Sequence, residues 1–112
     1  MKTKQEIVEN WLPRYTATAL EEFGEYILLT NFGDYVRRFS TRFGQPIKGL
    51  DRSMQTCSNG DNLTMINFGI GSANAALIMD LLTAIKPKGV LFLGKCGGLK
   101  DTTELGHFIL PI

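Results

Sequence analysis

Two glycine-rich segments, each following an apolar run, are the parts of this chain best suited to bind a small molecule. The first is Gly69-Ile-Gly-Ser-Ala-Asn74 and the second is Gly94-Lys-Cys-Gly-Gly98. A helical pattern separates them, so in a parallel sheet both segments would lie beyond the carboxyl ends of their strands, where open α/β sheets bind ligands. We therefore expect a small-molecule site at one edge of the sheet.

The first segment differs from a dinucleotide-binding fingerprint. It contains Gly69 and Gly71, but Asn74 stands where the third glycine belongs, and at least one strand precedes this unit. We therefore do not expect NAD to bind. Two interpretations stay open: the glycines contact a ligand, or they only permit a tight turn between strand and helix. The presence of the second glycine-rich segment favours ligand contact.

The second segment combines backbone freedom with a positive charge. Gly97 and Gly98 permit close approach of the backbone to a flat ligand such as a purine. Lys95 could offer its charge to an anion, although a solvated lysine at a strand end is the simpler interpretation. We expect Cys96 to be a small buried side chain and not a nucleophile, because no histidine partner is evident for it.

A third segment with potential for chemistry is Gly33-Asp-Tyr-Val-Arg37-Arg38, which follows the first apolar run at the start of a helical pattern. Backbone N–H groups at a helix N-terminus favour an anion, and an arginine one turn into the helix can add a bidentate contact to phosphate. Alternatively, Arg37 and Arg38 only coat the helix. The single histidine, His107, is expected to be structural.

The composition describes one domain of ordinary globular character. The chain has 112 residues, 44% hydrophobic, with a formal net charge of +1, so neither nucleic acid nor a membrane surface is expected as a partner. No apolar run approaches the roughly 18 residues of a membrane span. The two cysteines, Cys57 and Cys96, are expected to be reduced thiols in a cytoplasmic protein, with a disulfide between them as the alternative.

The hydrophobic pattern predicts alternating helices and strands that would position these segments. A capping box of Thr3 and Glu6 starts a helix that Pro13 is expected to end. Asn59-Gly60 predicts a tight hairpin turn. The remaining elements are expected as helices at about 34–43 and 72–85, and as strands at 26–29, 54–57, 63–68, 90–93 and 108–112.

The packing of these elements can also be predicted. Ile7, Val8, Trp11 and Leu12 fall on one face of the first helix. The helix at 72–85, with Ser72 as its N-cap, is apolar nearly all round and should be largely buried. The run at 90–93 does not alternate, as is typical of a central parallel strand, and 63–93 has the length of one right-handed βαβ unit.

The last predicted strand, 108–112, has no helix after it and would leave a sheet face uncovered. We therefore expect residues 1–112 to be a single domain that represents only the N-terminal portion of a longer protein.

Taken together, Gly33-Asp-x-x-Arg37, Gly69–Asn74 and Gly94–Leu99 resemble the purine nucleoside phosphorylase and uridine phosphorylase superfamily. The segments Lys4–Tyr15 and Tyr26–Phe32 resemble most its members that hydrolyse AMP. The resemblance implies an α/β, nucleoside-phosphorylase-like fold with a central mixed sheet flanked by helices, here incomplete at the C-terminus. It implies hydrolysis of AMP to adenine and ribose 5-phosphate, by a homo-oligomer that is often hexameric and uses neither cofactor nor metal.

The same resemblance implies roles for individual residues. Gly33 and Arg37, together with Lys95, would bind the substrate phosphate, and Arg52 would reach a neighbouring subunit's site. The general acid is expected beyond Ile112, so the 112-residue chain alone should be inactive. The base and ribose would be bound by Gly69, Gly71, Cys96, Gly97 and Gly98.

Two departures from the superfamily pattern bear on the reaction. The phosphorylases carry an arginine where this chain has Phe92, and a serine where it has Lys95. Loss of two ligands for inorganic phosphate favours hydrolysis over phosphorolysis. Two alternatives stay open: a related enzyme acting on unphosphorylated purine nucleosides, and an inert fragment with a partial nucleotide pocket.

Overall fold

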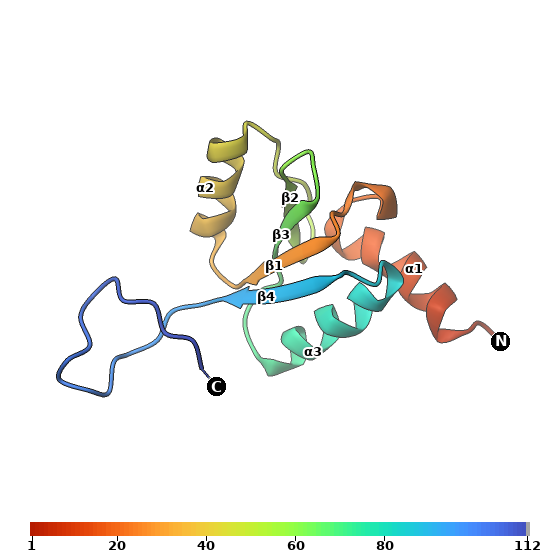
Figure 1. Ribbon diagram of the computed structural model, residues 1–112. Coiled ribbons are helices and arrows are strands. Elements are labelled where there is room, and N and C mark those ends of the chain that lie inside the picture. The colour runs from red at the N-terminus through yellow and green to blue at the C-terminus, as the bar shows by residue number, and fades with distance from the viewer. Residues whose placement is uncertain (112) are drawn as a thin grey trace.

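The computed structural model describes residues 1–111, in which helices pack on both faces of a four-stranded mixed sheet (Figure 1). The elements follow one another as α1 (Lys4–Thr16), β1 (Tyr26–Thr30), α2 (Gly33–Phe43), β2 (Gln55–Ser58), β3 (Leu63–Asn67), α3 (Ser72–Leu81) and β4 (Gly89–Leu93). Short 3₁₀ turns, η1 (Leu20–Glu22) and η2 (Leu82–Ala84), follow α1 and α3. None of the helices in these residues is long and apolar enough to span a membrane.

The strands lie in the order β2-β3-β1-β4, with β1, β3 and β4 parallel and β2 antiparallel to β3. Thr30 at the end of β1 is in register with Asn67 of β3 and with Leu93 of β4. The carboxyl ends of all three parallel strands therefore reach the same edge of the sheet, as the sequence predicts. We call this the carboxyl edge.

The predicted position of β4 at the centre of the sheet is wrong. The strand is parallel to β1, but it lies at the edge, and Val90, Leu91 and Phe92 are 38%, 52% and 53% exposed. The connection through α3 carries the chain from β3 past β1, so no described strand covers the far side of β4. A continuous apolar run indicates burial on both faces, but it does not distinguish a central strand from an apolar edge.

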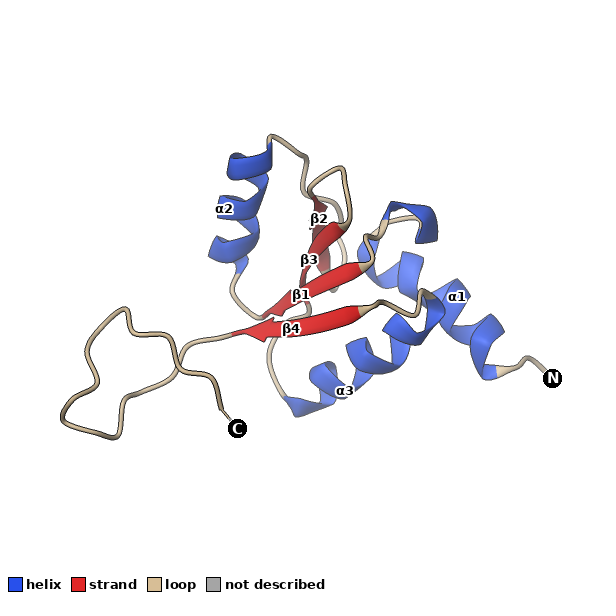
Figure 2. Ribbon diagram, in the orientation of Figure 1, coloured by secondary structure: helices blue, strands red, loops and turns tan. Residues whose placement is uncertain are grey.

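The core is divided between the two faces of the sheet, and Figure 2 shows α2 on the other side of the strands from α1 and α3. Ile27 and Leu29 of β1 pack with Leu12 and Ile78 on the face covered by α1 and α3. The intervening Leu28 packs with residues of α2 on the opposite face. Each fully buried aliphatic side chain stabilises the fold by about 1.5–3 kcal/mol, and this packing fixes the direction in which the carboxyl edge points.

Helix α1 begins as predicted but ends later. Thr3 and Glu6 form the reciprocal capping box, whereas Pro13 lies inside the helix, which continues to Thr16. Proline deprives the helix of one hydrogen bond, but burial of Thr16, whose hydroxyl donates to the Leu12 carbonyl over 2.8 Å, holds the last turn in place. Of the predicted apolar face, Val8 and Leu12 are buried and the two flanking residues, Ile7 and Trp11, are exposed.

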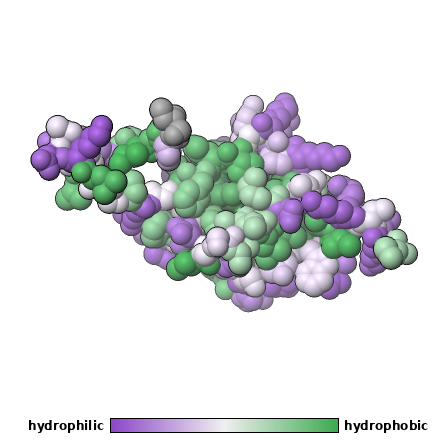
Figure 3. Space-filling model, turned by 90° about the horizontal axis from the view of Figure 1, so that it is seen from below, coloured by the Kyte–Doolittle hydropathy of each residue, from purple (hydrophilic) through white to green (hydrophobic). Residues whose placement is uncertain are grey.

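Helix α3 differs from its prediction in cap and in burial. Gly71 is the N-cap, without a side-chain hydrogen bond, and Ser72 is the first helical residue. The α-helix ends at Leu81, where η2 takes over. Only Ile78 and Leu81 of this helix are buried, and Met79 is 50% exposed, because one side of α3 has no described partner. Figure 3 shows the resulting apolar surface on the side of α3 and β4.

Several local predictions at turns and cysteines are confirmed. Asn59 and Gly60 form the β2–β3 hairpin turn, with Gly60 at φ +83°. Helix α2 ends near the predicted position 43: Gly44 caps it in the left-handed conformation, and Phe43 is 37% exposed. Both cysteines are free thiols.

Beyond β4 the chain forms turns and loops that extend away from the sheet (Figure 1). The strand predicted at 108–112 is absent over 108–111, where no neighbouring strand is at hand to pair with it, and Ile112 lies outside the described residues. His107 lies in a turn, where its Nδ1 accepts a hydrogen bond from the Glu104 backbone over 3.2 Å, which agrees with a structural role.

Candidate functional site

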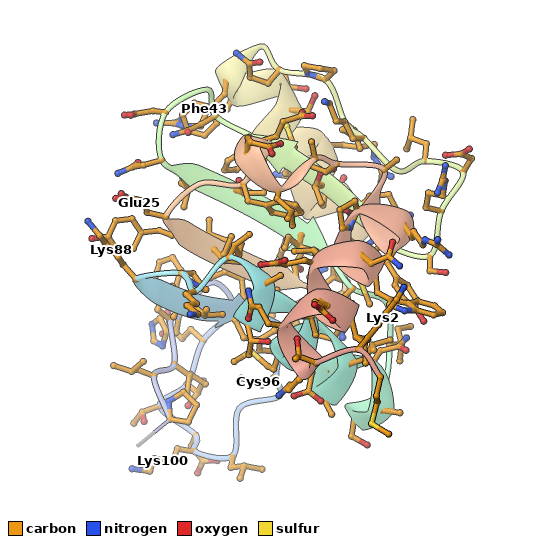
Figure 4. The ribbon with its side chains drawn as sticks, turned by 90° about the vertical axis from the view of Figure 1, so that its right-hand side faces the viewer. Lys2, Glu25, Phe43, Lys88, Cys96 and Lys100 are labelled. Atoms are coloured by element: carbon orange, nitrogen blue, oxygen red, sulfur yellow. The ribbon has the colours of Figure 1, made fainter. Side chains whose placement is uncertain are left out.

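The loops after β1, β3 and β4 converge at the carboxyl edge of the sheet. Figure 1 shows the arrowheads of β1 and β4 pointing to the side on which α2 begins. Phe68, after β3, packs on Phe92 of β4 with ring centroids 5.9 Å apart, and Lys95 lies over the ring of Phe32 after β1. At the opposite end of the sheet, Glu25 and Lys88 form an exposed ion pair at 3.2 Å, and their side chains lie next to each other in Figure 4.

The turn between β1 and α2 presents a helix N-terminus to this edge. Phe32 is the N-cap of α2, and no side chain caps the first turn, so its backbone N–H groups are not satisfied by a local cap. An Arg37 guanidinium nitrogen lies 3.5 Å from the point where a Cβ on Gly33 would stand. The structure thus brings Gly33 and Arg37 together, as the sequence predicts.

The first turns of α2 carry more positive than negative charge. Arg38 donates to the Asp34 carboxylate over 2.8 Å and Arg37 over 3.4 Å, so two cations share one anion. The hydrogen bond from Arg38, with the charges of both arginines, holds the pKa of Asp34 below its ordinary value. Two arginines against one carboxylate leave this surface with a net positive charge that suits an anion.

Asn67, at the end of β3, is a residue of this edge that the sequence did not predict. Its Oδ1 accepts from the Gly69 N–H over 3.1 Å, and its Nδ2 donates to Gln55 over 3.1 Å. The same Nδ2 is 3.8 Å from the Cβ position of Gly33. A second amide, Asn31, has a buried Oδ1 without a hydrogen-bond partner in residues 1–111. Both residues could have been found in the sequence as amide side chains at or just beyond the end of an apolar strand, Asn67 in β3 and Asn31 after β1.

The first glycine-rich segment needs its glycines for backbone conformation. Gly69 has φ +87° and Gly71 has φ +106°, values that side-chain-bearing residues rarely adopt. A Cβ at Gly71 would meet nothing within 4 Å, so the surface above it is open. The turn explains both glycines, and their contact with a base or ribose stays a prediction.

The second glycine-rich segment is open to solvent. Cys96 is exposed and not buried as expected, because the chain leaves the sheet directly after β4. A Cβ at Gly97 would meet nothing within 4 Å, whereas at Gly98 it would lie 2.8 Å from Cβ of Thr103. The Lys95 ammonium lies 4.5 Å from the ring centroid of Phe32.

Arg52 lies away from the carboxyl edge. Its guanidinium donates to the Arg14 carbonyl over 2.9 Å, at the end of α1. It lines an open hollow of about 440 Å³ together with Trp11, Arg14, Tyr15, Asp51 and Ser53. A smaller hollow, of about 70 Å³, lies between Thr18 and Cys57. Neither of these two hollows includes a residue of the glycine-rich segments.

Comparison with known proteins defines the class of this chain. The family model described as the phosphorylase superfamily matches residues 16–112. The chain therefore belongs to the phosphorylase superfamily, and its mixed sheet flanked by helices is the nucleoside-phosphorylase-like fold expected from the sequence.

Particular relatives narrow the comparison. The crystal structure of AMP nucleosidase from Bacteroides thetaiotaomicron VPI-5482 matches with a TM-score of 0.83 and 63% identity, over 88% of this chain and 42% of that one. AMP nucleosidases of Escherichia coli, from strain K12 and from O157:H7, are each 25% identical over 135 residues, covering 88% of this chain. The chain spans 28% of the length of these curated relatives.

Proposed function

We propose that this chain carries a nucleotide-binding part of an enzyme that hydrolyses the N-glycosidic bond of AMP, releasing adenine and ribose 5-phosphate. The observation that carries the proposal is the turn at Gly33, where a helix N-terminus, Arg37 and the Lys95 loop meet at the carboxyl edge. The relatives named AMP nucleosidase support the choice of substrate.

In this proposal the 5′-phosphate binds at the turn between β1 and α2. The N–H groups after Phe32 and the guanidinium of Arg37 donate to it, and Lys95 adds a second charge. The ribose and base then lie across the loops after β3 and β4. That surface is formed by Gly69, Gly71, Cys96, Gly97 and Gly98.

Hydrolysis is favoured over phosphorolysis by the residues around β4. Phe92 packs its ring on Phe68, so an apolar contact occupies the strand position where the phosphorylases carry an arginine. Inorganic phosphate thus finds fewer ligands here, whereas a substrate that brings its own phosphate still meets Arg37 and Lys95. Water is then the expected acceptor of the ribosyl group.

Cleavage of an N-glycosidic bond passes through an oxocarbenium-like state and needs an acid to protonate the leaving purine. Asp34, the carboxylate nearest the phosphate turn, is bound by Arg37 and Arg38 and held in its ionised form. It is therefore unsuited to that role. We propose that the general acid is not part of residues 1–112, and that these residues form one N-terminal, nucleotide-binding portion of the domain.

The test compares adenine release from AMP with release from adenosine, with and without inorganic phosphate. For a full-length enzyme containing this sequence, we expect AMP to be hydrolysed without added phosphate. For the 112-residue chain we expect binding of AMP with little or no turnover. Cleavage of adenosine that requires phosphate, with AMP inert, would instead assign a nucleoside phosphorylase.

We also propose a homo-oligomer, hexameric by family analogy, in the cytoplasm. The hollow beside Arg52, with the exposed Trp11 on its rim, supports a surface that meets a neighbouring copy. The two free cysteines support a reducing compartment. Light scattering of the full-length protein measures the assembly, and a monomer that retains full activity would reject the proposed contribution of Arg52.

A further inference from the structure

The side chain of Lys95 is held by two aromatic rings. Its Nζ lies 4.5 Å from the ring centroid of Phe32 and 5.6 Å from that of Tyr35. The two rings pack on each other at 5.5 Å with an interplanar angle of 56°. Both distances lie within the range in which an ammonium is attracted by the face of an aromatic ring. We call Phe32 and Tyr35 the aromatic seat.

No carboxylate neutralises this ammonium within the described part of the chain. Lys95 takes part in none of the ion pairs formed by residues 1–111, whereas Arg37 and Arg38 both bind Asp34. A ring face attracts the charge without accepting hydrogen bonds in the way that a carboxylate does. The N–H groups of Lys95 are therefore left for an acceptor outside this set of residues.

The aromatic seat flanks the proposed phosphate turn on both sides in the chain. Phe32 immediately precedes Gly33, and Tyr35 follows it by two residues in the first turn of α2. Lys95 comes from the opposite loop, after β4, and lies over these rings. The seat thus brings a cation from a distant part of the sequence to the turn where Arg37 approaches Gly33.

We propose that Lys95 determines the preference for a nucleoside monophosphate over the unphosphorylated nucleoside, and that Phe32 and Tyr35 are the positioning residues that make it effective. This inference rests on the proposed function, because it assumes that the 5′-phosphate binds at the Gly33 turn. A lysine side chain loses considerable rotamer freedom when it binds a ligand. The aromatic seat restricts that freedom in advance, which lowers the cost of binding.

The test is a calorimetric titration of the 112-residue chain with AMP and with adenosine, for the wild type and variants. We expect Lys95→Met to reduce the preference for AMP by about tenfold. Phe32→Leu, which removes one ring and keeps an apolar side chain, should reduce it by about two- to fivefold. The matched control is Phe43→Leu, at the far end of α2, which should leave the preference unchanged.

A double-mutant cycle distinguishes positioning from a general structural effect. If Phe32 acts through Lys95, then Phe32→Leu has no further effect in the Lys95→Met background, and Lys95→Arg keeps much of the preference. As a second measurement, NMR should show ring-current shifts of the Lys95 ε-methylene protons that disappear in Phe32→Leu.

The possible failures are separable. A wild-type chain that binds adenosine as tightly as AMP overturns the proposed function and this inference with it. A wild-type preference for AMP that Lys95→Met leaves intact overturns only the role of Lys95. The positioning role of the aromatic seat is overturned if Phe32→Leu reduces the preference for AMP equally in the wild type and in Lys95→Met. It is also overturned if Phe32→Leu binds AMP more tightly than the wild type.

Discussion

Arg37 is the residue whose replacement tests the phosphate turn most simply. Its guanidinium lies beside Gly33 and its partner Asp34 is shared with Arg38. A hydrogen bond to a charged group contributes about 1.5–3 kcal/mol, so Arg37→Ala should weaken AMP binding by at least about tenfold. Arg38→Ala, on the same carboxylate, is the matched control and should change affinity little. If both variants weaken AMP binding equally, Arg37 acts only through the general positive charge of the surface and not through a specific contact with the phosphate.

Asp34 gives the site a predictable response to acid. Its folded-state pKa lies below the ordinary value of 3.8, because Arg38 donates a hydrogen bond to the carboxylate. The carboxylate therefore stabilises the fold above pH 3.8, and this contribution is lost as the pH falls through the lower folded-state pKa. Between pH 7 and pH 3, the urea midpoint of unfolding should therefore fall more for the wild type than for Asp34→Asn. Parallel losses in both proteins would contradict this assignment.

The two thiols should differ in reactivity. Cys96 is exposed on the loop after β4, whereas Cys57 is buried on β2, and burial raises the pKa of its thiol. Because the thiolate is the reactive form, a thiol reagent should modify Cys96 rapidly and Cys57 only on unfolding. Cys96→Ser should remove the fast phase measured by mass spectrometry. Rapid modification of two thiols in the native wild type would contradict the burial of Cys57.

At the scale of elements, the loop from Gly49 to Ser53 must fit against the end of α1. A Cβ on Gly49, at φ +80°, would lie 2.7 Å from the Thr16 carbonyl oxygen and closer still to that of Met54. Gly49→Ala should therefore destabilise the fold by more than about 2 kcal/mol, in chemical denaturation. Gly44→Ala is the control. Gly44 also has a left-handed φ, of +62°, but a Cβ there would meet nothing within 4 Å, so we expect a loss of stability of only about 1 kcal/mol. Equal losses would contradict the close approach.

The helices and strands could be predicted mainly because their apolar residues repeat with the right period. The predictions are wrong where packing in the folded protein overrides a rule based on neighbouring residues, such as the rule that proline ends a helix. Pro13 is tolerated because the last turn of α1 is anchored by the buried Thr16. Ser72 was expected as a cap, but the glycine before it supplies the unusual backbone angle at the turn. Burial of α3 and β4 was overestimated because an apolar surface does not reveal whether a partner covers it.

At the scale of the whole molecule, the parallel order of β3, β1 and β4 explains how Phe32 and Lys95, far apart in the sequence, come together. The glycine-rich segments could be assigned to one edge because strand direction fixes where each loop emerges. The contacts across that edge could not be predicted. The position of Lys95 over Phe32, and the Asn67 hydrogen bonds, depend on side-chain directions that only packing determines.

The molecule also has an exposed apolar surface on the side of α3 and β4, which no described element covers (Figure 3). The phosphorylase-superfamily relatives are longer than this chain, which spans 42% of the solved Bacteroides structure and 28% of the Escherichia coli proteins. At the carboxyl edge, the carboxylate of the proposed phosphate turn, Asp34, is bound by Arg37 and Arg38, and the proposed general acid lies outside this chain. Binding without turnover is therefore the behaviour that the account predicts for the 112-residue chain.

An NMR titration of the 112-residue chain with AMP and with adenosine tests the central claim most directly. We predict that AMP shifts the backbone amides of Gly33, Gly69 and Gly97, and binds at least about tenfold more tightly than adenosine. Equal affinity for the two ligands would contradict the proposed phosphate turn. Shifts confined to the hollow beside Arg52 would contradict the location of the site at the carboxyl edge.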